Sequence, residues 1–212
     1  ANSTTLNGNA VSDPSPGVNP LQAGILMNAP ENATPGYLRA DPTPSATNVA
    51  TVTFDVVVDP NAMNGLIIEN QGFVSGSGVG SGPQPEQPSD DPSTPIPDDP
   101  TRNIVGNLPL LYAHKTAQIH EDFGSPGIVD PGDVLRYTFT ISNFGAIPGT
   151  SVVLTDAVPN DTTYVAESLR LNGVFLGSDG GVLPLIAGLT VNSSDNPGAG
   201  IVSAGESAVI TF

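Results

Sequence analysis

The chain has 212 residues, a length that allows one or two domains with a buried core. Its 21 acidic residues outnumber its 5 lysines and arginines, and the net charge of -16 argues against nucleic acid and anionic membranes as partners. The absence of cysteine excludes disulfide bonds and thiol chemistry, and no apolar run is long enough for membrane insertion.

The first part of the chain, residues 1–75, contains two predicted strands, at 50–58 and 66–74. Both segments are rich in β-branched residues and are bounded by turn-forming residues. No segment of the chain combines helical periodicity with capping residues, so we expect no substantial helix.

Residues 76–106 have the composition of a linker. Gly and Ser dominate its first half, which is typical of a flexible segment, and Pro and Asp dominate its second half, which is typical of a semi-rigid one.

The last part, residues 107–212, again contains short predicted strands, for example at 134–141 and 151–155. Short strands separated by Gly, Pro and Asn turns are typical of a β-sandwich. We therefore expect an all-β fold made of tandem Ig-like β-sandwich repeats.

An internal repeat relates the two ends of the chain. Residues 20–38 and 184–202 align without gaps, 164 positions apart, and share seven identities. Matches flank this alignment in the same order, 6–8 with 171–173 and 50–54 with 208–212. We expect 1–75 to be the C-terminal part of one Ig-like repeat and 107–212 the N-terminal and central part of the next. On this reading the repeats are incomplete at both chain ends.

Lys115 is the only lysine, and it lies in a predicted strand at 111–119. Strand alternation places it on one face with Leu111, Ala113, Ala117 and Ile119. An ammonium group on an apolar face must be paired, neutralised or consumed, because burying an unpaired charge is costly.

Two other polar residues are expected on the apolar faces of their strands. Asp156 alternates with Val152 and Leu154, and Asn70 alternates with Leu66 and Ile68. A lysine, an acid and an asparagine in an apolar pocket are the groups that form a spontaneous isopeptide bond, because burial favours a neutral amine and a protonated acid.

The alignment places Asn70 and Lys115 in different sequence repeats, so this bond would join adjacent repeats or copies of the chain. The alternatives are a buried Lys115–Asp156 salt bridge, with Asn70 as an ordinary strand residue, and an exposed lysine.

Acidic residues crowd the linker and the entrance to the second part of the chain, where calcium is the ion that their oxygens would favour. They are Asp90, Asp91, Asp98, Asp99, Asp130 and Asp133. The alternative is a solvated acidic segment. No catalytic motif is present in the sequence, so we expect neither an enzyme nor an organic cofactor.

Several motifs resemble the conserved repeat domain of bacterial and archaeal surface proteins known as domain of unknown function 11. They are the segments 115–117, 129–138, 142–145, 154–159 and 68–72, with Gly72 departing from the usual Ala. The resemblance implies Ig-like sandwiches strung in tandem in large surface proteins, and it implies no catalysis. The proposed Lys, Asp and Asn set is similar to that of isopeptide-forming collagen-binding surface proteins.

Two functions follow as hypotheses. The first is a structural repeat unit of an extracellular fibre or stalk, whose partners are copies of itself or adjacent repeats that complete its sandwiches. The second is a cell-surface adhesin that binds glycan or protein through loops at the end of a sandwich.

Overall fold

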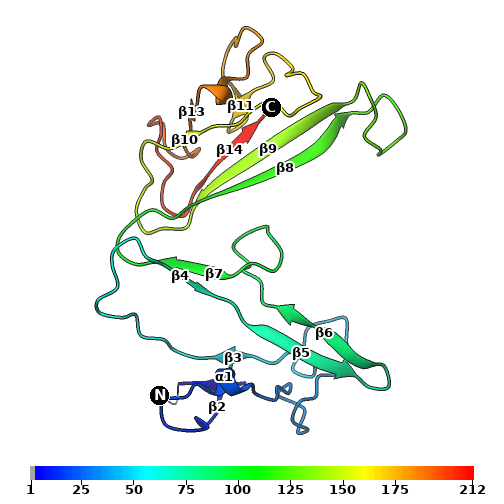
Figure 1. Ribbon diagram of the computed structural model, residues 1–212, viewed down its shortest axis with the longest axis vertical. Helices are drawn as coiled ribbons and strands as arrows, with labels where there is room; N and C mark the ends of the chain where they lie inside the picture. Colours follow the sequence, from blue (N-terminus) through cyan, green and yellow to red (C-terminus); the bar gives the residue numbers. More distant parts are fainter. Residues whose placement is uncertain (1–2) are drawn as a thin grey trace. The chain divides into compact units, whose positions relative to one another are not determined.

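The computed structural model describes residues 3–212, and its secondary structure is almost entirely β. The strands form several antiparallel sheets, which confirms the expected all-β class (Figure 1). The chain divides into two compact units, Ala1–Pro60 and Asn61–Phe212. Within the described residues, no helix has the length and apolar character needed to cross a membrane.

The first unit has a small sheet in the order β2-β1-β3, made of β1 (Thr5–Leu6), β2 (Asn9–Ala10) and β3 (Val52–Thr53). Asn7 and Gly8 join β1 to β2 with φ angles of 51° and 79°. A two-residue Asn-Gly loop with positive φ at both positions is a favoured hairpin turn. Between β2 and β3 lies a single helical turn, α1 (Pro20–Ala23), which Asn19 caps.

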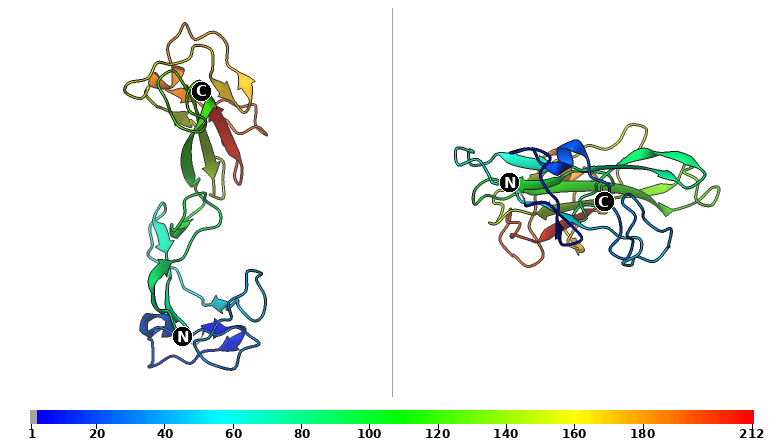
Figure 2. Two further views of the ribbon diagram at one scale, coloured as in Figure 1. Left: turned by 90° about the vertical axis from the view of Figure 1, so that its right-hand side faces the viewer. Right: turned by 90° about the horizontal axis from the view of Figure 1, so that it is seen from below.

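The second unit contains a five-stranded sheet in the order β12-β11-β14-β9-β8. Its long strands are β8 (Leu111–Glu121) and β9 (Val134–Asn143), which run side by side as green and yellow-green ribbons in two views (Figure 2). The shorter strands are β11 (Arg170–Leu171), β12 (Val174–Phe175) and β14 (Ser207–Thr211).

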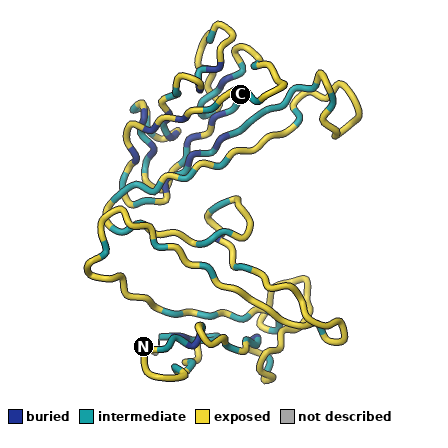
Figure 3. Tube along the Cα trace, viewed as in Figure 1, coloured by how far each residue is buried: buried dark blue, intermediate teal, exposed yellow. Residues whose placement is uncertain are grey.

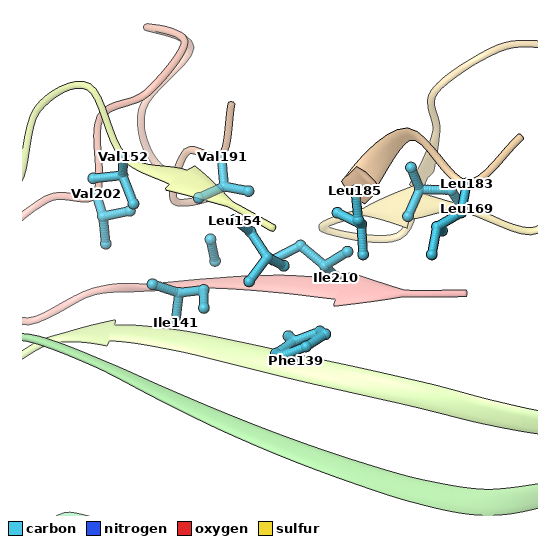
Figure 4. Close-up of a cluster of buried hydrophobic side chains, with 11 residues drawn as sticks. Phe139, Ile141, Val152, Leu154, Leu169, Leu183, Leu185, Val191, Val202 and Ile210 are labelled. Atoms are coloured by element: carbon cyan, nitrogen blue, oxygen red, sulfur yellow. The ribbon is translucent and has the colours of Figure 1, made fainter. Parts of the chain in front are cut away.

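A second layer covers the β9–β14 part of this sheet. It consists of the pair β10 (Val153–Leu154) and β13 (Leu189–Thr190) together with the 3-10 turn η1 (Pro184–Ile186). Side chains from both layers meet in the core (Figure 4). The buried core residues are Phe139, Ile141, Val152, Leu154, Leu169, Leu183, Leu185, Val191, Val202, Ala208 and Ile210. The core therefore lies over β9 and β14, and β8 flanks it at the edge of the sheet.

Residues 76–106, expected to be a linker, contribute to strand pairs instead. The hairpin strands β5 (Phe73–Gly78) and β6 (Gly82–Pro88) pair with each other, and β4 (Ile67–Asn70) pairs with β7 (Thr101–Ile104). These pairs cross the expected boundary at residue 75, and the division between compact units falls after Pro60. Main-chain pairing orders this polar segment although most of it is exposed (Figure 3).

Candidate cross-linking site

The Lys115 ammonium group lies beside the margin of the core, in the middle of the edge strand β8. In register, Lys115 faces the buried Phe139 of β9. Its Nζ is 2.6 Å from Oδ2 of Asp156, forming a hydrogen-bonded ion pair. The structure therefore brings together two of the three residues that the sequence singled out.

Three aromatic rings surround the same ammonium group. Nζ lies 4.7 Å from the ring centre of Tyr137, 5.0 Å from that of Phe139 and 5.9 Å from that of Phe212. The ring of Phe212 stacks on both of the others. Ring faces attract a cation, so these contacts and the carboxylate both hold Lys115 in place. This ring cluster was not predicted from the sequence, although Tyr137 and Phe139 lie on the same face of β9 by strand alternation.

Asp156 is positioned by the second layer. It follows β10, where Leu154 is buried in the core, and its N–H donates to the carbonyl of Leu185 at 3.1 Å. One end of the Lys115–Asp156 pair thus comes from the sheet edge and the other from the covering layer.

The expectation of a buried lysine was wrong. The side chains of Lys115 and Asp156 are 33% and 20% exposed, and Ala113 and Ala117 on the same face are exposed too. The reason is the edge position of β8, because the buried side chains of the covering layer pack over β9 and β14 and none of the core residues belongs to β8. A half-exposed ion pair of this kind is worth roughly 0–1 kcal/mol.

Asn70 lies elsewhere in the second unit. It is an exposed residue at the end of β4, where its carbonyl accepts a hydrogen bond from the Thr101 hydroxyl at 3.0 Å. That pair of strands is a separate sheet from the one that contains Lys115. The three predicted residues are therefore not brought together within one copy of the chain.

The outer edge of β8 has unpaired backbone groups. Among the described residues, β8 pairs only with β9, through ten of the 11 residues of β8. The N–H of Phe144 donates to the carbonyl of Leu110, so the pairing alternation points the backbone groups of Ala113, Lys115 and Ala117 away from β9. An edge strand of this length is a template on which another strand can pair.

The acidic residues considered for calcium are spread over two loops. The carboxylates of five of the six accept hydrogen bonds from N–H or hydroxyl groups of the chain. Asp91 accepts from the Ser93 hydroxyl at 2.6 Å, and this bond holds the pKa of Asp91 below its ordinary value. Asp133 accepts from the N–H groups of Asp130 and Phe123, which likewise lowers its pKa. Among residues 3–212, no three acidic or histidine side chains are grouped as metal ligands. Calcium binding stays a prediction.

A cavity of about 840 Å³ opens at the end of the second unit where the β8–β9 turn and the loop after β10 meet. Its wall includes Arg136, which contacts His120 at 2.5 Å, and the hydroxyl-bearing residues Tyr164 and Thr162. Burial raises the pKa of Tyr164, whose hydroxyl hydrogen-bonds to Asp179 at 2.5 Å.

Asn143, which lies in the 142–145 motif, holds several segments of the second unit together. It is 1% exposed, and its Oδ1 accepts from the N–H groups of Leu110 and Gly145, both at 3.0 Å. Its Nδ2 donates to the carbonyls of Ile147 at 2.8 Å and Val202 at 3.1 Å. One side chain thereby ties the start of β8 to the loop before β14.

Comparison with protein-family models, curated proteins and solved structures finds no match.

Proposed function

We propose that the chain is a structural repeat unit of an extracellular or cell-surface fibre or stalk, assembled by strand pairing between units. The observation that carries this proposal is the 11-residue edge of β8, whose outward backbone groups have no partner among the described residues. Another copy of the chain, or an adjacent repeat, supplies the strand that pairs with this edge.

The composition supports an extracellular assembly of this kind. Short strands in a chain without cysteine need another source of stability, and lateral pairing of strands provides main-chain hydrogen bonds. The resemblance of several segments to tandem repeats of surface proteins points to the same setting.

Lys115 lies on β8, and its pair with Asp156 supplies an amine and a proton acceptor, the groups that an isopeptide bond across this strand contact needs. Nζ of Lys115 first gives a proton to Asp156, and the resulting neutral amine attacks Cγ of Asn70 from another copy or an adjacent repeat. Asp156 then passes that proton to the leaving amide nitrogen. A bond forms between Nζ and Cγ, the bond between Cγ and Nδ2 breaks, and the amide nitrogen leaves as ammonia. The side chains are then joined by an isopeptide bond.

The edge is tested by a proline that spares the pairing of β8 with β9. The N–H of Ala117 points away from β9, so Ala117→Pro removes a donor only from the outer edge. We expect wild-type chain and Ala117→Ser to form regular filaments in negative-stain micrographs, and Ala117→Pro to remain dispersed with an unchanged circular dichroism spectrum. Filaments of folded Ala117→Pro would disprove the role of this edge.

The isopeptide bond is tested separately, by mass spectrometry of assembled material. A cross-linked peptide pair containing Lys115 and Asn70 must be lighter by about 17 Da, the mass of the ammonia released. Asn70→Ala and Asp156→Ala must lack this species. An unmodified Lys115 peptide in all assembled wild-type material rules out the bond but leaves strand pairing intact.

The cavity at the end of the second unit favours one other function, an adhesin that binds glycan or protein through the loops there. Arg136, Tyr137 and Tyr164 line it together with polar loop residues. A glycan array with the wild-type chain and Arg136→Ala tests this function, which requires a ligand whose binding the substitution weakens at least tenfold.

A further inference from the structure

The sheet of the first unit and one side of the large sheet in the second unit are built alike. In the first unit, β1 pairs with β2 and β3 through Thr5↔Ala10, Leu6↔Asn9, Thr5↔Thr53 and Leu6↔Val52. In the second, β11 pairs with β12 and β14 through Arg170↔Phe175, Leu171↔Val174, Arg170↔Thr211 and Leu171↔Ile210. The two three-stranded frames have the same register at the offsets of the sequence repeat.

The same side-chain hydrogen bonds hold both frames. Asn7 Nδ2 donates to the carbonyl of Asn28 at 2.6 Å, and Asn172 Nδ2 donates to that of Asn192 at 2.7 Å. The Oδ1 atoms of Asn7 and Asn172 accept from the N–H groups of Thr51 at 2.9 Å and Val209 at 2.8 Å. The two frames are therefore equivalent in detail, so a difference between them is informative.

The difference lies at the outer edge of the third strand. In the second unit, β14 pairs on this edge with β9 over five residues, from Ser207↔Ser142 to Thr211↔Thr138. In the first unit, β3 pairs only with β1 among the described residues. Because Thr51 binds Asn7 on the β1 side, strand alternation directs the backbone groups of Ala50, Val52 and Phe54 to the open side.

The side chains under this edge are correspondingly less covered. Leu185, Val191 and Ile210 of the second unit are fully buried, and Phe139 and Ile141 of β9 complete their core. Their equivalents in the first unit, Leu21, Met27 and Val52, are only half-buried. The first unit thus presents both an unpaired strand edge and an incompletely covered apolar face in the place that β9 fills in the second unit.

We propose that the β3 edge of the first unit is a docking site for a strand of the β9 type. The occupant is an extended segment that pairs antiparallel with 49–54 in the register of β9 on β14. It carries large apolar or aromatic residues at the positions of Phe139 and Ile141 and hydroxyl residues between them. The second unit identifies this occupant, since the same frame there holds such a strand. The inference rests on the proposed assembly by strand pairing and adds a second joint, distinct from the β8 edge.

The register allows a direct chemical test with the full chain. Phe212 and Tyr137 exchange both backbone hydrogen bonds, at 3.1 and 2.9 Å, so Val209 and Thr140 form a closely spaced pair suited to a disulfide. Thr51 is the exposed equivalent of Val209, and the chain has no cysteine of its own. The probe is a synthetic peptide of residues 132–145 with Thr140→Cys, mixed with full-length Thr51→Cys under mild oxidation.

We expect the peptide to form a disulfide with Thr51→Cys at least tenfold faster than with Ala10→Cys, a control on the exposed strand β2. A second peptide, with Thr138→Cys in place of Thr140→Cys, is two residues out of register and should react more slowly with Thr51→Cys. Peptide mapping locates the bond, and circular dichroism verifies that both chain variants are folded. Equal rates at positions 51 and 10, or equal rates for the two peptides, would overturn the docking site.

This result is separable from the test of the proposed function. Filaments that form while the peptide shows no preference for position 51 would refute the β3 docking site and leave assembly through β8 standing. Capture of the peptide at position 51 by a chain that never forms filaments would support the docking site and count against the fibre.

Discussion

The side chain of Asn143 offers the sharpest test of how the second unit is held together. Asn143→Ala removes four hydrogen bonds, two to N–H groups and two to carbonyls, at a position only 1% exposed. At roughly 1 kcal/mol for each bond, and with backbone groups left unpaired, the loss in free energy of unfolding is about 3–5 kcal/mol. A loss of this size is a large fraction of the stability of a small domain.

Urea titration monitored by circular dichroism measures the loss in free energy of unfolding. Hydrogen exchange at the amides of β9 and β14 shows whether the same strands are destabilised. The matched control is Asn160→Ala, at an exposed position after β10. We expect the control to change stability by less than about 0.5 kcal/mol, as is usual for surface substitutions. If Asn143→Ala costs less than about 1 kcal/mol with an unchanged m-value, the network is not a major source of stability, and the hydrogen-bond reasoning fails.

Three further predictions concern backbone space, charge and pH. Gly145→Ala should destabilise the second unit by about 1–3 kcal/mol in urea titration, because a Cβ there would overlap the backbone before β8; Gly76→Ala, with open space around it, should be nearly neutral. A double-mutant cycle with Lys115→Met and Asp156→Asn should give a coupling of about 0.5 kcal/mol that shrinks in 1 M salt, and a coupling above about 2 kcal/mol would contradict the partial exposure of the pair. The hydrogen bond from Tyr164 holds the pKa of Asp179 below its ordinary value of 3.8. The ionised carboxylate therefore stabilises the fold at neutral pH, and this stability is lost as the pH falls below about 4. Asp179→Asn should reduce the loss in free energy of unfolding between neutral and acidic pH, measured by urea titration.

Local chemistry was sufficient to predict the β class, and the aligned segments at the two ends of the chain form three-stranded frames of the same register. Runs of β-branched residues between Gly, Pro and Asn turns indicated short strands, and β9 was found close to its observed bounds. The matches at 6–8 and 171–173 proved to be equivalent Asn-Gly hairpin turns. Turns of this kind depend on the backbone freedom of two adjacent residues, which a sequence displays directly.

The partner of each strand, and the cover over each face, depended on residues far apart in the chain. Residues 76–106 read as a linker because their composition is polar, yet Arg102 pairs with Glu69 across β4 and β7 at 2.9 Å and the segment forms strand pairs. Alternation correctly placed Lys115 on the side of the sheet that faces the core. It could not show that β8 is an edge strand beside the buried core, because the order of strands in a sheet is a property of tertiary pairing and not of any local pattern.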